Sequence, residues 1–280
     1  MKWASAISRQ TPLENAILEC ATSLRQQLGG APAHLAATFV SPHYQEEYEQ
    51  LPQLVRQALD APLVFGCSGG GIIGSGLEVE QQPAVSITAG SLPDVEIVGV
   101  HLDGDKLPDL DAGPQAWYDL VKVIPGQGPQ FVLLADPFSF PVQNLLMGLD
   151  FAFSQSAKIG GLASGAQQQG QNALFLGERV YRSGAIGLAL HGNIAVDTVV
   201  AQGCRPIGKP MRITQCRRNV LLELDGQLPL AILRAMFQSL DQRDRELMRN
   251  SLFLGVVMDE FMDTPKQGDF LIRNVVGMDE

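Results

Sequence analysis

Residues 62–76 read PLVFGCSGGGIIGSG, an apolar run that leads directly into a bend with three consecutive glycines. The apolar run predicts a buried β-strand. The glycines predict a tight turn, or a place where the backbone approaches another group closely, because glycine carries no Cβ. A second segment of the same kind, KIGGLASG, occupies residues 158–165. The sequence therefore predicts two strands that each end in a glycine-rich bend.

The flanking sequence predicts alternating helices and strands. The helix at 11–28 has the clearest signals, with Thr11 as its cap, Pro12 in its first turn, Glu14 completing a capping box and Gly29 ending it. Cys20 falls on its apolar face and is expected to be buried. Further helices are expected at 52–59, 114–123 and 141–154, and strands at 35–40, 62–68, 84–90, 96–102, 131–136, 158–164, 173–178 and 184–192.

This order of elements repeats within the chain. A shift of 95 residues aligns Ser41-Pro42 with Asp136-Pro137, and later shifts of 88 and 89 align residues near the ends of the two copies. We therefore expect an internal duplication. The copies span about 11–104 and 114–192. The glycine and alanine pairs that match are Gly66 with Gly161, Gly70 with Gly165, Ala84 with Ala173, Gly99 with Gly187, and Gly104 with Gly192.

Each copy is expected to form a β-α-β-β-β unit that is preceded by a helix. Helices would cover one face of its sheet and leave the other face apolar. Two copies can bury these bare faces against each other, which predicts an α+β fold of two packed mixed sheets with outer helices, an α/β/β/α arrangement. A single mixed sheet with helices on both faces is the alternative.

The pattern changes after Val196. Two long β-like segments flank GCRPIGKP at 203–210, followed by helices at 228–240 and 241–250 and strands at 251–261 and 269–278. Five basic residues lie in the turn at 203–210 and in the second of the two segments. We expect one domain at 1–207 and a smaller α+β part at 208–280 that docks on the first domain or is incomplete. The basic residues are Arg205, Lys209, Arg212, Arg217 and Arg218.

Composition excludes several classes of function. The chain has 280 residues, 45% of them hydrophobic, with 20 Lys and Arg against 30 Asp and Glu, a net charge of −10. This acidity argues against nucleic-acid binding and against anchoring on an anionic membrane. The N-terminus lacks the pattern of a signal peptide, so a cytoplasmic protein is expected. No metal or cofactor is expected, because neither the cysteines (Cys20, Cys67, Cys204, Cys216) nor the histidines (His34, His43, His101, His191) have ligand spacing.

The glycine-rich bend admits three interpretations. Gly69, Gly71 and Gly74 match the dinucleotide fingerprint, but the helix which that chemistry needs does not follow. The segment 66–70 also matches a nucleophile elbow, so a hydrolase or acyltransferase that uses Ser68 or Cys67 stays open. His191 could serve it as the base, with Asp136, Asp150 or Asp197 as the acid. We favour a loop that contacts a ligand.

Two basic positions add to this site. Arg205 follows a predicted strand beside Gly203, where its guanidinium could hold a carboxylate with two hydrogen bonds. Arg273 and Asn274 lie inside an apolar strand, where a charged residue needs a partner or a cavity. A structural ion pair is the alternative for both arginines.

Three segments together resemble the FIST family of sensory proteins. They are GCSGGGIIGSG at 66–76, GCRPIG at 203–208 and FLIRNVVGMD at 270–279. The resemblance implies a FIST N-like domain at 1–207 and part of a FIST C-like domain at 208–280, since the family's second domain continues further. It also implies a cytoplasmic domain of signal transduction that binds small molecules, with amino acids as suggested ligands and no catalytic residues. Some relatives resemble haem sensors, but no ligating histidine can be mapped here.

The leading hypothesis is a non-enzymatic sensor for an amino acid or a small carboxylate, in which backbone amides freed by glycine hold an anionic group. A scaffold that binds a signalling protein through the surface at 205–218 is a further alternative. The candidate ligand-binding residues are Gly66, Cys67, Ser68, Gly69, Gly70, Gly71, Gly161, Ser164, Gly165, Arg205, Arg273 and Asn274.

Overall fold

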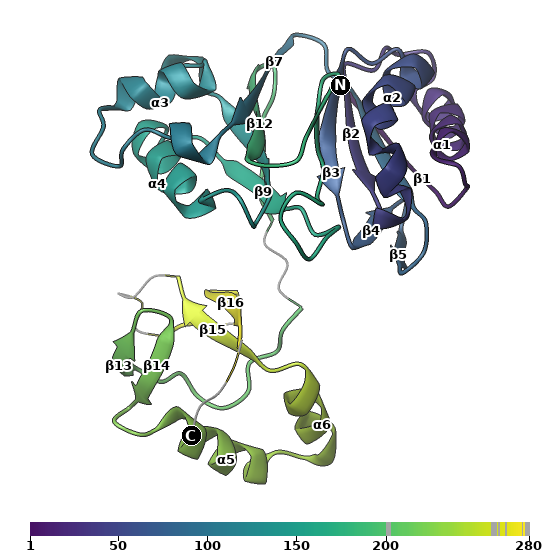
Figure 1. Ribbon diagram of the computed structural model, residues 1–280. Helices are drawn as coiled ribbons and strands as arrows, with labels where there is room; N and C mark the ends of the chain where they lie inside the picture. The colour runs from purple at the N-terminus through teal and green to yellow at the C-terminus, as the bar shows by residue number, and fades with distance from the viewer. Residues whose placement is uncertain (200–202, 259–261, 263, 267, 276, 278–280) are drawn as a thin grey trace. The chain divides into compact units, whose positions relative to one another are not determined.

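The computed structural model describes residues 1–199, 203–258, 262, 264–266, 268–275 and 277 (Figure 1). Contacts within the chain divide it into two units, Met1–Thr198 and Val199–Glu280. The sequence placed the domain boundary somewhat later, after residue 207. Each unit has its own sheets and helices.

The first unit contains two main sheets and a small hairpin, with helices outside the sheets. One sheet has the strand order β1-β6-β2-β3-β10-β11 and the other β7-β12-β8-β9, while β4 and β5 pair with each other. Three short 3₁₀ segments lie between these elements, at Pro42–Gln50, Gly104–Lys106 and Pro125–Gln127. The elements are β1 (Lys2–Ser8), α1 (Leu13–Leu28), β2 (Leu35–Val40), α2 (Leu51–Leu59), β3 (Leu63–Ser68), β4 (Gly71–Gly74), β5 (Leu77–Glu80), β6 (Val85–Ser91), β7 (Val95–Leu102), α3 (Pro114–Val121), β8 (Gln130–Ala135), α4 (Val142–Ala152), β9 (Lys158–Leu162), β10 (Leu174–Leu176), β11 (Arg179–Tyr181) and β12 (Ala185–Gly192).

Three apolar cores hold these layers together. One core joins α1 and α2 to the outer face of the first sheet, and a second joins α3 and α4 to the outer face of the second sheet. The third lies between the sheets, where Phe65 and Leu174 of the first meet Leu134 and Ile186 of the second. In Figure 1 the two helix pairs accordingly lie on opposite sides of the strands. The predicted α+β fold with two packed mixed sheets and outer helices is confirmed.

The short strands β4, β5 and β11 were not predicted, and neither was the longer strand β1. Strand β1 pairs antiparallel with β6 along its whole length, and from Ala4 on its side chains alternate between buried and half-buried positions. The buried positions that face α1 carry only Ala4, Ala6 and Ser8. Such small side chains give a weak period-two signal, because their hydrophobicity differs little from that of their polar neighbours.

The start of α1 also differs from the prediction. Pro12 occupies the N-cap position, and no side chain within the helix forms the expected capping box. Instead the carboxylate of Glu47, from a separate segment, accepts a hydrogen bond of 3.1 Å from the amide of Leu13. A tertiary contact therefore satisfies the donor that a local cap would otherwise take. The predicted end is confirmed, since Gly29 adopts the left-handed conformation at φ 61° and ψ 39°.

The two sheets share one strand pattern, β1-β6-β2-β3 matching β7-β12-β8-β9. Ser41 and Asp136 follow equivalent strands, and their amides donate 2.9 Å bonds to Ala84 and Gly184 respectively. The sequence matched β7 with β12, but these strands are neighbours in one sheet, and β12 takes the place of β6. The internal duplication stays a prediction, and the strand pattern suggests how its copies would correspond.

Glycine permits a close strand approach at equivalent places in both sheets. A Cβ on Gly66 would lie 1.7 Å from the carbonyl oxygen of Thr38, and one on Gly160 would lie 1.8 Å from that of Leu133. The sequence paired Gly66 with Gly161, whereas the register shows Gly160 as its counterpart. At Gly161 an added Cβ would meet no atom within 4 Å. These neighbouring glycines therefore have different structural roles.

The second unit consists of two hairpins and two helices. The expected β-like segment before residue 203 extends into residues outside the described part, and residues 203–212 form no strand. Most side chains are exposed or half-buried, and Leu224 alone among the described residues of this unit is buried. The elements are β13 (Ile213–Arg217), β14 (Val220–Leu224), α5 (Pro229–Ser239), α6 (Gln242–Asn250), β15 (Phe253–Val257) and β16 (Phe270–Asn274).

The two neighbouring glycines of β9 provide a matched test of this packing. We expect Gly160→Ala to lower the free energy of unfolding by about 2–3 kcal/mol, because its methyl group collides with backbone. Gly161→Ala should change it by less than ~0.5 kcal/mol, because the added methyl group enters open space. Urea denaturation followed by circular dichroism measures both values. Equal effects of the two substitutions would contradict the observed register.

Candidate functional site

The bends that end β3 and β9 meet each other in the first unit. The amide of Ser164 donates to the carbonyl oxygen of Ser68 at 3.2 Å, and the amide of Gly70 donates to the hydroxyl of Ser164 at 3.1 Å. The two bends lie so close together that a Cβ on Gly165 would be 2.7 Å from the Cβ of Ser68. The structure thus brings together two sets of predicted site residues that lie almost 100 positions apart in the sequence.

A buried polar network lies beneath this junction. The hydroxyl of Ser68 donates to the side-chain oxygen of Asn172 at 3.2 Å, and the amide nitrogen of Asn172 donates to Asp136 at 2.9 Å. The second oxygen of Asp136 accepts a 2.5 Å bond from Ser139. Ser68, Asn172 and Asp136 are completely buried. Because unpaired polar groups are costly in the interior, this chain of bonds holds the strand ends in one arrangement.

The same network fixes the bend between β3 and β4. The amides of Ser68 and Gly69 donate 2.9 Å bonds to the carbonyl oxygens of Ala173 and Val40. Together with the bond from Gly70 to Ser164, these contacts use three of the amides that were expected to hold an anionic ligand. These three amides therefore already have protein acceptors, and the binding of an anionic group by the remaining glycine amides stays a prediction. Gly70, Gly71 and Ser164 remain exposed above the network, and Gly165 is half-buried.

The geometry does not favour Cys67 or Ser68 as a nucleophile. Burial raises the pKa of the Cys67 thiol to about 12, so it is protonated at neutral pH. The Ser68 hydroxyl bonds Asn172 and accepts a 3.0 Å bond from the amide of Ala173. The proposed base, His191, instead lies 3.6 Å from Glu96 on the neighbouring strand. The described contacts of Ser68 therefore include no base.

Arg205, Arg273 and Asn274 belong to the second unit. Arg205 forms a 2.5 Å ion pair with Asp244, so its guanidinium already has a carboxylate partner. Arg273 and Asn274 lie at the exposed end of β16, where the Arg273 guanidinium donates to the carbonyl oxygen of Ile272 at 3.1 Å. A single pocket that joins these residues to the strand ends of the first unit stays a prediction.

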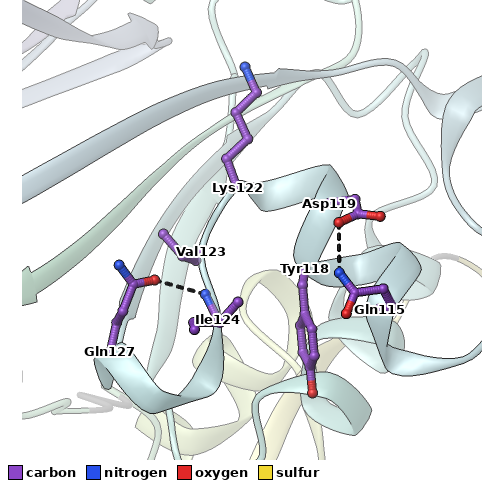
Figure 2. Close-up of a pocket in the computed structure, with 7 residues that line it drawn as sticks. All are labelled: Gln115, Tyr118, Asp119, Lys122, Val123, Ile124 and Gln127. Carbon is purple, nitrogen blue, oxygen red and sulfur yellow. Dashed lines mark hydrogen bonds between the residues drawn. The ribbon is translucent and has the colours of Figure 1, made fainter.

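Two surface hollows lie away from the strand-end junction. One, of about 500 Å³, lies beside the end of α3, and Figure 2 shows its lining side chains. Gln115 bonds Asp119, and Gln127 bonds the amide of Ile124, so several of its polar groups already have partners. The other, of about 330 Å³, is lined by Arg205, Asp241, Arg243, Asp244 and Leu247. Only Arg205 of the predicted site residues lines either hollow.

Sequence reasoning missed two of the four side chains of the buried network. Asp136 was noticed as the counterpart of Ser41, but Ser139 and Asn172 were not singled out. Asn172 lies in an irregular segment between β9 and β10, where no periodic pattern marks its side chain as buried. Its role follows from the crossing of β10 to the first sheet, which places Leu174 opposite Cys67.

The described part of the chain shows neither a metal cluster nor a membrane-spanning helix. Among these residues, no group of three or more His, Cys, Asp and Glu side chains is arranged to hold a metal ion. None of the described helices is long and apolar enough to cross a membrane.

Comparison with known proteins identifies similar sequences. Residues 34–227 match the family model of the FIST N domain. The chain is 32% identical over 279 residues to the uncharacterized protein Rv0628c of Mycobacterium tuberculosis, covering all of this chain and 71% of that protein. It is 31% identical over 264 residues to the uncharacterized protein Mb0898c of Mycobacterium bovis, covering 94% of this chain and 66% of that protein.

The contribution of the buried network can be measured at Asn172. We expect Asn172→Ala to lower the free energy of unfolding by about 2–4 kcal/mol, because Ser68 and Asp136 both lose a buried partner. The matched control is Asn144→Ala, at an exposed position of α4, which should change it by less than ~0.5 kcal/mol. Chemical denaturation of the three proteins gives these values. A neutral Asn172→Ala would show that the network does not stabilise the strand ends.

The buried thiols provide a second test. Iodoacetamide should label the exposed Cys216 of the native protein, whereas Cys67 and Cys20 should react only after unfolding. Raising the pH from 7 to 9 should not speed the labelling of Cys67, whose pKa is about 12. Mass spectrometry of tryptic peptides locates the label. Fast native labelling of Cys67 would instead support the nucleophile hypothesis.

Proposed function

The chain belongs to the FIST family, and from that premise we propose that it is a cytoplasmic sensory protein that binds an amino acid or a small carboxylate. FIST N domains are small-ligand sensory domains of signal transduction. The proposed ligand class is narrower than this family-level statement. The ligand therefore has to be identified first.

The junction of β3 and β9 is the proposed binding place. In open α/β sheets, ligands bind outside the carboxyl ends of the parallel strands. Here two such ends, one from each sheet, converge through the contact between Ser68 and Ser164. This convergence is the observation that carries the proposal. The exposed surface above it consists of Gly70, Gly71 and Ser164, with Gly165 at its margin.

Ser164 is the proposed polar contact of the ligand. Its oxygen accepts the bond from Gly70, which leaves the hydroxyl hydrogen able to donate to a carboxylate oxygen. Glycines on either side allow a ligand to approach the backbone closely. A ligand that binds Ser164 therefore acts on the bend that the buried network supports.

The same network supplies a route for a signal. Ser164 contacts Ser68, and from Ser68 hydrogen bonds continue through Asn172 and Asp136 to Ser139. The Ser139 hydroxyl accepts a 3.0 Å bond from the amide of Gly184, just before β12. A change at the exposed bend would thus reach the start of a central strand of the second sheet. Binding rather than catalysis is proposed, because Cys67 and Ser68 are buried and the Ser68 hydroxyl is bonded within this network.

A thermal-shift screen with the common amino acids and small carboxylates tests this proposal. We expect at least one compound to raise the melting temperature of the wild-type chain in proportion to its concentration. Ser164→Ala should weaken the apparent affinity for that compound at least tenfold, because the charged group of the ligand loses a hydrogen bond. The matched control, Ser154→Ala, replaces an exposed serine near the opposite end of β9 and should bind like the wild type.

Two results would contradict the proposal. If no compound of these classes stabilises the chain at millimolar concentration, the ligand class is wrong. If a compound stabilises wild type and Ser164→Ala equally, the ligand binds elsewhere, and Arg205→Ala then tests the hollow of the second unit.

A further inference from the structure

The outer edge of β9 is an unfilled strand position. In the first sheet, the equivalent strand β3 carries β10 on its outer edge, where Leu174–Leu176 pair antiparallel with Phe65–Cys67. Strand β9 ends the order of the second sheet, and among the described residues no strand pairs with its outer edge. The two sheets match in strand order up to this position. The difference leaves one place for an added antiparallel strand.

The free hydrogen-bonding groups of this edge can be assigned by residue. The amide of Phe131 donates to the carbonyl oxygen of Ala157, and the amide of Ala163 donates to that of Ala135. In a parallel pair, alternate residues bond the same neighbour. The backbone groups that bond β8 are therefore those of residues 157, 159, 161 and 163. The amides and carbonyls of Lys158, Gly160 and Leu162 point to the open edge.

The edge lacks the exposed charge that usually prevents strand association. Its only charged residue, Lys158, has a side chain that is 8% exposed and forms a 2.8 Å ion pair with Asp150. Its ammonium group also donates to the carbonyl oxygen of Phe153 at 2.6 Å. The edge strand β7 of the same sheet instead carries Glu96, whose side chain is 78% exposed. Exposed charges of that kind protect sheet edges from pairing.

Strand β9 is complementary to a second copy of itself. A two-fold axis beside Gly160 pairs this residue with its own copy and places Lys158 opposite Leu162 of the second copy. Ile159, which is 37% exposed, then lies beside Gly161 of the second copy. An added Cβ at Gly161 would meet no atom within 4 Å, so the isoleucine has room there. Leu162, 54% exposed, lies along the aliphatic stem of the opposite Lys158.

We propose that two copies of this chain associate through antiparallel pairing of their β9 strands, which joins their second sheets into one continuous sheet. The backbone bonds of Lys158, Gly160 and Leu162 hold the pair, and Ile159 and Leu162 add apolar contact. This association is independent of the ligand site, since it uses the free edge of β9 rather than the exposed bend that follows the strand.

Light scattering coupled to size-exclusion chromatography tests the association on the full chain. We expect a concentration-dependent dimer between about 1 and 100 µM. Leu162→Lys should weaken it at least tenfold, because it places a second ammonium group beside the opposite Lys158. The matched control is Met147→Lys, which replaces a 57% exposed residue of α4 and should leave dimerisation unchanged. A monomer throughout this range overturns the proposal, as does a dimer that resists Leu162→Lys.

Cross-linking tests the register itself. In a Cys216→Ser background, a mixture of Ile159→Cys and Gly161→Cys chains should form a disulfide-linked dimer under mild oxidation. Residues 159 and 161 face each other as a non-hydrogen-bonded pair, whose Cβ atoms come within reach of a disulfide. Either variant alone should cross-link at least tenfold more slowly. Equal rates in the mixture and in the separate variants would reject this pairing, even if a dimer forms.

Discussion

The apolar contact between the inner faces of the two sheets is the constraint on which the first unit depends. Each sheet buries one face under its own helices and has to cover the other. Phe65 and Leu174 on one side, with Leu134 and Ile186 on the other, supply the central part of that cover. Because the sheets face each other, the ends of β3 and β9 come together at their junction. The location of the candidate site follows from this packing.

Polar groups that the packing buries then need partners. Ser68, Asn172 and Asp136 are completely buried, and each finds its partners in segments that are distant in the sequence. Such a network favours one arrangement of the strand ends, because any displacement leaves a buried donor or acceptor without a partner. The glycine-rich bend above it is therefore held in place, although glycine alone would leave it flexible. A defined bend of this kind is a better recognition surface than a mobile loop.

Much of the local structure could be predicted from the sequence. The helix that ends at Gly29 and most strands of the first unit follow from hydrophobic period and from glycine placement. The strand that carries Ala4 and Ala6 was not predicted, because its buried residues are small. The capping of α1 by Glu47 was not predicted, because it depends on a distant segment of the chain. Within the candidate site, Ser68 and Ser164 were predicted from glycine-rich patterns, whereas Asn172 has no local pattern.

The sequence by itself determined most of the elements and the two glycine-rich bends, and it predicted two sheets that cover each other. These features depend on neighbouring residues, whose spacing is printed in the chain. Only the tertiary structure decided that β10 crosses to pair with β3 and that Gly160 rather than Gly161 lies against Leu133. It also decided that no strand of the described residues pairs with the outer edge of β9. Strand pairing between distant segments depends on how whole faces pack, and no local spacing records that choice.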